Sequence, residues 1–160
     1  MCRITEVLKY VYKNYPLESR KELSLDRLIK VLFLIDWKAA IKSEENVTRT
    51  RWNIINSEPK MDNNSLKRVI DFIERMPQIV PFNLFQKLDA SQREVIDFVI
   101  ETVSTKDDRE LTLLVNSTFP VVTQDEADII DLSRLAITYN RELKPMLEQE
   151  KVGSLIVHKH

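Results

Sequence analysis

The stretch LDRLIKVLFLIDWKAAI, residues 25–41, decides the fold of this chain. Apolar side chains recur along it at helical spacing, and further apolar residues fill most of the remaining circumference. Ser24 is placed to cap the helix, and Asp26 lies in its first turn, where a carboxylate is favourable. A helix that is apolar on most sides needs neighbours on several sides. Residues 25–41 are therefore predicted to form the central helix, with other helices packed around it.

The segments next to the central helix predict one more helix and one strand. Apolar residues between positions 4 and 15 recur at i, i+3, i+4 and i+7, which is typical of an amphipathic helix that Pro16 would close. From residue 47 to 55 the pattern alternates with period two, which predicts a strand with arginines on its exposed side. A polar turn at residues 56–59 should end this strand.

The middle of the chain predicts two further helices and a second strand. One helix begins behind a cap at Asp62 or Asn64, and the other opens with a capping-box pair, Asp89 and Gln92. Residues 79–88, between these helices, are apolar and contain proline. We assign them to a short strand that pairs with the first strand and completes a small sheet.

Two more helices are expected toward the C-terminus. The first begins near Asp107 and ends at Phe119 and Pro120, since proline cannot continue the helical hydrogen bonds. The second starts around Asp131 and is kinked or broken by Pro145. The predicted fold class is mainly α: a compact helical domain around a central apolar helix, with a small two- or three-stranded β element.

The composition is that of an ordinary folded chain of 160 residues, 43% hydrophobic and 31% charged. At this length we expect one domain, residues 1–148, followed by a C-terminal tail, residues 149–160. The net charge of −1 provides no global field that would attract nucleic acid or an anionic membrane, so neither is expected as a partner. Because the sequence shows neither a signal peptide nor a long apolar run, we expect a cytoplasmic protein. Its oligomeric state stays open.

Whole classes of enzyme are excluded by what the chain lacks. Gly153 is the single glycine, whereas phosphate-binding loops, dinucleotide-binding turns and nucleophile elbows need at least two glycines at fixed spacing. The two histidines, His158 and His160, lie in the tail, and the single cysteine is Cys2. We therefore expect no enzymatic activity, no cofactor and no metal. A carboxylate-dependent hydrolase is the enzymatic alternative, and it would need two acidic residues converging in a cleft.

Two blocks of the sequence resemble the SocA-like, or Panacea, antitoxin domain. The first is VLFLID, residues 31–36, followed by a strand, and the second is STFP, residues 117–120, followed by LAITY, residues 135–139. The resemblance spans about residues 24–140. The family's Tyr-Gly-Pro turn is replaced here by NSEP, residues 56–59, which has no glycine. We therefore expect a turn that ordinary residues can adopt, such as type I.

The resemblance implies a mostly helical protein with a small sheet that works by protein–protein contact. It would neutralise a cognate protein toxin by direct binding, or deliver that toxin to a protease. The alternative is a nucleic-acid-associated regulator, or an antitoxin that also represses its own promoter. That alternative would need a basic helix facing a DNA groove, which the sequence does not offer.

The candidates for partner contact come from the central helix, the predicted strand and the turn after it. They are Asp36, Trp37, Arg49, Arg51, Trp52, Glu58 and Pro59. On the functional interpretation, Asp36 faces a groove for the partner, and the arginines contact either carboxylates of a protein partner or an operator DNA. On the structural interpretation, Asp36 is buried and hydrogen-bonded, the tryptophans belong to the core, and the arginines lie on a solvated strand face.

Overall fold

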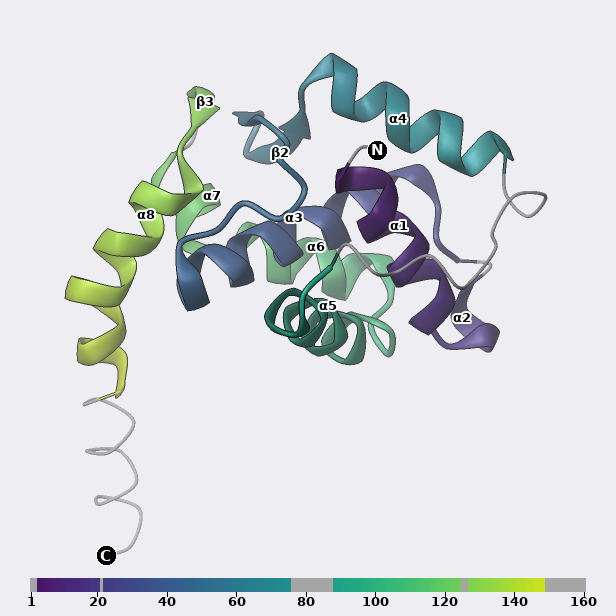
Figure 1. The fold of residues 1–160 in the computed structure, drawn as a ribbon. Helices are drawn as coiled ribbons and strands as arrows, with labels where there is room; N and C mark the ends of the chain where they lie inside the picture. The colour runs from purple at the N-terminus through teal and green to yellow at the C-terminus, as the bar shows by residue number, and fades with distance from the viewer. Residues whose placement is uncertain (1–2, 21, 76–87, 125–126, 149–160) are drawn as a thin grey trace, which may run out of the picture.

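The central element of the computed structural model is helix α3 (Leu25–Ser43), as the sequence predicts. The structure describes residues 3–20, 22–75, 88–124 and 127–148. Ser24 caps α3 by accepting a hydrogen bond from the backbone N–H of Arg27 at 3.2 Å. Helices α5 (Ala90–Val103), α6 (Asp108–Asn116) and α8 (Leu132–Thr138) all pack against α3. Figure 1 shows α3 running through the middle of the molecule.

Helix α1 (Arg3–Asn14) packs on α4 (Asn63–Arg75) and also on α5. Pro16 follows α1 as predicted, and a short helix, α2 (Leu17–Arg20), comes next. Of the two predicted caps of α4, Asp62 is the one used, because its Oδ1 accepts a hydrogen bond from the Ser65 N–H at 2.8 Å.

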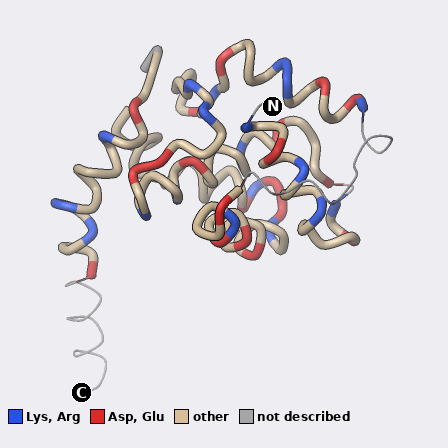
Figure 2. The backbone as a smooth tube through the Cα atoms, viewed as in Figure 1, with Lys and Arg blue, Asp and Glu red and all other residues tan. Residues whose placement is uncertain are grey.

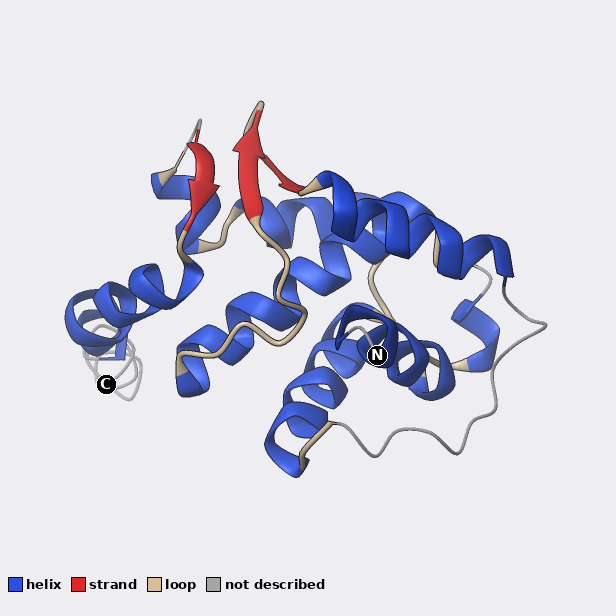
Figure 3. Ribbon diagram, turned by 45° about the horizontal axis from the view of Figure 1, so that its top comes forward, coloured by secondary structure: helices blue, strands red, loops and turns tan. Residues whose placement is uncertain are grey.

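The three strands of the sheet are β1 (Trp52–Ile55), β2 (Glu58–Met61) and β3 (Ala127–Ile130). They lie in the order β2-β1-β3, and both neighbouring pairs are antiparallel (Figure 3). The small β element is therefore three-stranded. The predicted strand at residues 79–88 falls almost wholly outside the described residues. Strand β3 also pairs with β1, and the sequence pattern did not predict it.

The predicted first strand, residues 47–55, is wrong over its first half. Only residues 52–55 are extended in the sheet, whereas residues 47–51 form a loop. Arg49 has a left-handed φ of 60°, which interrupts any extended run. Thr48 and Thr50 are buried and hydrogen-bonded, whereas Arg49 and Arg51 are exposed. Buried and exposed residues therefore alternate along this loop as they would along a strand.

The predicted type I turn is also wrong. Asn56 and Ser57 have positive φ angles of 53° and 61°, and Ile55 pairs with Glu58 across the turn. A two-residue hairpin turn with both angles positive is of type I′, whose twist matches that of the flanking strands. Pro59 therefore does not end the β structure, and it lies in β2, an edge strand, where the missing N–H is tolerated.

The predicted caps of the later helices are confirmed, but the predicted helix end at Pro120 and the predicted break at Pro145 are not. Asp89 and Gln92 form the capping box of α5, and Asp107 caps α6. Helix α6 ends at residue 116, and Pro120 lies in the first turn of a new helix, α7 (Phe119–Thr123), where no N–H is needed. Before Pro145 the helix changes to a π-helical turn, η1 (Tyr139–Leu143), and helical structure continues through residue 148.

The buried apolar side chains form one continuous cluster to which the helices and the inner face of the sheet contribute. Trp37 on α3 stacks on Phe119 of α7 and meets Tyr139 of η1 edge-on, with ring centroids 6.4 Å and 5.6 Å apart. These rings hold the C-terminal helices against α3. In the part of the chain that the structure describes, no helix is long and apolar enough to cross a membrane.

Candidate partner-binding surface

Asp36 lies at the centre of a buried hydrogen-bond cluster that joins α3 to the loop before β1. Its Oδ1 accepts from the Thr48 N–H at 2.9 Å, and its Oδ2 accepts from the Thr48 hydroxyl at 2.5 Å and from the Trp52 indole N–H at 2.8 Å. The Thr48 hydroxyl also lies 2.7 Å from that of Thr50. Among the described residues, no lysine or arginine pairs with Asp36, so hydrogen bonds alone compensate its burial.

Burial raises the pKa of Asp36 to about 6, because the carboxylate has no contact with water. The hydrogen bonds from Thr48 and Trp52 favour the ionised form and oppose this effect without cancelling it. A raised pKa is common at catalytic acids, but such an acid must also reach a substrate. Asp36 is 0% exposed, so its position supports a structural role.

Of the seven candidates from the sequence, four are buried and cannot face a partner. These are Asp36, Trp37, Trp52 and Pro59. The functional interpretation of Asp36, Trp37 and Trp52 is therefore corrected: they belong to the core, where Trp52 packs edge-on against Phe33 at 5.2 Å. The exposed Arg49 and Arg51 and the half-buried Glu58 remain accessible.

Arg49 and Arg51 line a cavity of about 1020 Å³ that the sequence did not predict. Two more arginines line it, Arg3 at the start of α1 and Arg68 on α4. We call this cavity, with these four residues, the arginine groove. Figure 2 shows blue segments at the start of α1, before β1 and on α4 in the same part of the molecule. Sequence reasoning missed the groove because its arginines come from three separate segments.

The backbone at the arginine groove is held in place by side-chain hydrogen bonds. The Arg49 N–H donates to Asn46 Oδ1 at 2.8 Å, which supports the left-handed backbone at Arg49. The Arg51 N–H donates to Asp62 Oδ2 at 2.9 Å. Burial alone would raise the pKa of Asp62, but hydrogen bonds from Ser65 and the Arg51 N–H hold it below its ordinary value. Asp62 is therefore ionised, caps helix α4 and forms part of the lining of the groove.

The outer face of the sheet carries exposed apolar side chains. Trp52, Ile54 and Ile130 point into the core, whereas Ile55 and Ile129 are 45% and 69% exposed. Near Ile55 on β2, Glu58 forms an ion pair with Lys60 at 3.1 Å. We call the surface formed by Ile55, Ile129, Glu58 and Lys60 the outer sheet face. It combines exposed apolar side chains with charged neighbours.

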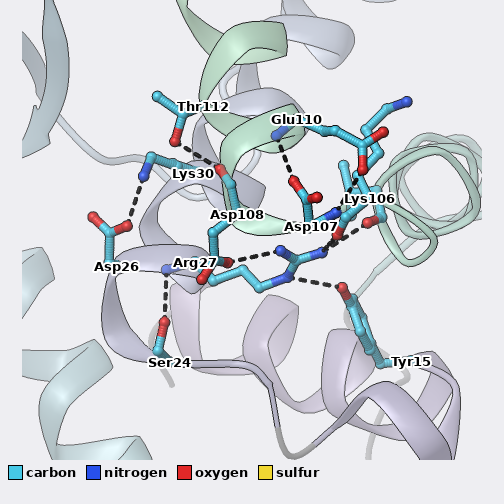
Figure 4. Close-up of polar contacts among 11 residues, drawn as sticks. Tyr15, Ser24, Asp26, Arg27, Lys30, Lys106, Asp107, Asp108, Glu110 and Thr112 are labelled. Carbon is cyan, nitrogen blue, oxygen red and sulfur yellow. Dashed lines mark hydrogen bonds and ion pairs between the residues drawn. The ribbon is translucent and has the colours of Figure 1, made fainter.

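A second buried polar cluster surrounds Arg27, which the sequence analysis did not single out. Arg27 is 2% exposed and donates to Asp108 Oδ1 at 2.9 Å, to the Val103 carbonyl at 2.8 Å and to the Tyr15 hydroxyl at 3.3 Å (Figure 4). It also donates to the Lys106 carbonyl. A signal was present, since an arginine within the apolar central helix needs partners. The cluster ties α3 to the end of α5 and the start of α6.

No family model, no curated protein and no solved structure matches this chain. Among the described residues, no three histidine, cysteine, aspartate or glutamate side chains gather where they could hold a metal ion. The functional interpretation therefore depends on the two surfaces, the outer sheet face and the arginine groove.

Proposed function

We propose that this protein is a non-catalytic protein-binding module of the antitoxin type, which neutralises a cognate toxin by direct contact in the cytoplasm. The observation that carries the proposal is the outer sheet face, where Ile55 and Ile129 are exposed at the surface of an otherwise well-packed sheet. Exposed apolar groups with charged neighbours are a common composition of protein–protein contact surfaces.

The buried candidates support this surface from behind. Trp52 fixes β1 to α3 through Asp36 and Phe33, so the strand is a rigid platform. Pro59 and Met61 pack inward from β2, which leaves Glu58 and Lys60 for the rim. A preorganised platform loses little conformational entropy when a partner binds, which favours tight association.

The experiment that tests this proposal co-expresses this protein with the neighbouring gene, because the family resemblance implies that this gene encodes the toxin. We expect relief of toxicity and a complex that co-elutes in gel filtration. The variant Ile55→Lys with Ile129→Lys should lose both, because two charges would have to be buried in the contact. Lysine at position 55 also faces Glu58, so the hairpin keeps a favourable cross-strand pair.

The matched control is Leu113→Lys, which introduces the same charge at a side chain that is 61% exposed and belongs to helix α6, outside the sheet. It should keep both the rescue and the complex. A neighbouring product that is not toxic and does not bind would contradict the proposal, as would equal rescue by all variants. The half-life of the toxin in the same cells separates simple occlusion from delivery to a protease.

A further inference from the structure

We propose that the arginine groove binds the phosphate backbone of a double-stranded nucleic acid. The proposal goes beyond the proposed function and does not depend on it, since the outer sheet face plays no part in it. It starts from the convergence of Arg3, Arg49, Arg51 and Arg68 on one cavity of about 1020 Å³. All four cations are arginines, whose planar guanidinium groups bind phosphate oxygens in a bidentate manner.

Three of these guanidinium groups are available for a ligand. Arg49, Arg51 and Arg68 are exposed, and within the described residues none of them forms an ion pair with a carboxylate. Arg3 also donates to Gln92 at 3.2 Å. Asp62, the acidic residue in the lining, directs its oxygens to N–H and O–H donors of the chain. A positive charge therefore remains in the groove.

The other lining residues favour phosphate over a protein partner. Apart from the arginines and Asp62, the described lining consists of Ile4, Thr48, Asn63, Asn64 and Ser65. A protein interface needs an apolar centre, but Ile4 is the one apolar residue among them and is 1% exposed. Hydroxyl and carboxamide side chains beside arginines are, in contrast, the groups that contact phosphate and sugar in nucleic-acid complexes.

The lining also distinguishes between kinds of nucleic acid. Single-stranded ligands are held by bases stacked on aromatic side chains, and the described lining contains no aromatic residue. The groove can therefore contact the backbone of a duplex but offers no platform for unpaired bases. Because the whole protein has a net charge of −1, the attraction is local, and binding should be weak and independent of base sequence.

The test measures fluorescence anisotropy of a labelled 24-base-pair DNA duplex at 30 to 200 mM NaCl, with the RNA duplex of the same sequence as a second probe. Three to four phosphate contacts predict a slope of log K against log salt of about −3. We expect the magnitude of the slope to fall by about 1 in each of the variants Arg49→Asn, Arg51→Gln and Arg68→Gln. Asparagine is chosen at position 49 because it tolerates a positive φ. The triple variant should not bind. Whichever duplex binds more tightly identifies the source of the phosphates.

The matched control is Arg109→Gln, which removes an exposed arginine of α6 outside the groove and should leave the slope unchanged. The urea midpoint of each variant verifies that it is folded. The proposal would be overturned by no binding to either duplex at 30 mM NaCl, by equal losses of duplex affinity in Arg109→Gln and the groove variants, or by preferential binding of a 12-residue polyglutamate peptide. Tight binding of inorganic phosphate alone would also overturn it, since the site would then fit a small anion.

Discussion

Asp36 shows at the scale of a single residue how a charged group can be buried without a counter-ion. Its two oxygens accept from a backbone N–H, a hydroxyl and an indole N–H. Each of these donors lies on the loop or strand that follows α3, so satisfying Asp36 also fixes where that segment lies. The sequence could predict that a buried Asp36 needs hydrogen-bond partners, but not which residues would supply them.

Trp52→Phe should destabilise the protein because it removes the indole donor to Asp36. The loss of one hydrogen bond to a buried charged group predicts a fall of about 1–3 kcal/mol in the free energy of unfolding, measured by urea titration at pH 7. Trp37→Phe is the matched control, because it shrinks another buried indole without removing a bond to Asp36. Equal effects of the two substitutions would show that the bond contributes nothing.

The raised pKa of Asp36 predicts a particular dependence of stability on pH. Since the pKa is about 6 in the folded protein and 3.8 in the reference state, the folded form binds the proton more tightly. The stabilising contribution of that proton is complete below pH 3.8 and is lost as the pH rises through 6. When the pH is lowered from 7 to 5, the free energy of unfolding of the native protein should therefore rise by about 1 kcal/mol relative to that of Asp36→Asn. Parallel stability profiles of the two proteins would contradict this.

At the scale of elements, the helices could be predicted from local signals, whereas the sheet could not. Ser24, Asp89 and Asp107 cap their helices as expected, because a cap and an apolar stripe lie within a few residues of each other. Strand β3 pairs with β1 from more than 70 residues away, and its four residues carry no comparable local signal. Long-range pairing depends on how the helices place the two segments.

The hairpin turn gives a prediction at this scale. Ser57 adopts a φ of 61°, which costs energy for a residue with a Cβ atom and none for glycine. Ser57→Gly should therefore stabilise the protein by about 0.5–1 kcal/mol, measured as a higher thermal midpoint. Ser104→Gly, at a residue with a φ of −62°, is the control and should bring no gain. A lower midpoint for Ser57→Gly would contradict the type I′ turn.

At the scale of the whole molecule, the chain presents two surfaces of different chemistry. The outer sheet face has apolar side chains with charged neighbours, and the arginine groove is polar and positive. Both lie next to β1, whose position is fixed by the buried cluster around Asp36. The sequence predicted a surface in this region, but it could not separate the exposed arginines and Glu58 from the buried tryptophans, because burial depends on the tertiary structure.

Calorimetric titration of the neighbouring gene product with the native protein and with Ile55→Lys tests the proposed function most directly. The native protein should bind, and the variant should bind about 30-fold more weakly, because a buried lysine at the centre of the contact costs about 2 kcal/mol. Leu113→Lys and the triple arginine variant should bind as the native protein does. Equal affinity of Ile55→Lys and the native protein would contradict the assignment of the outer sheet face as the partner-binding surface.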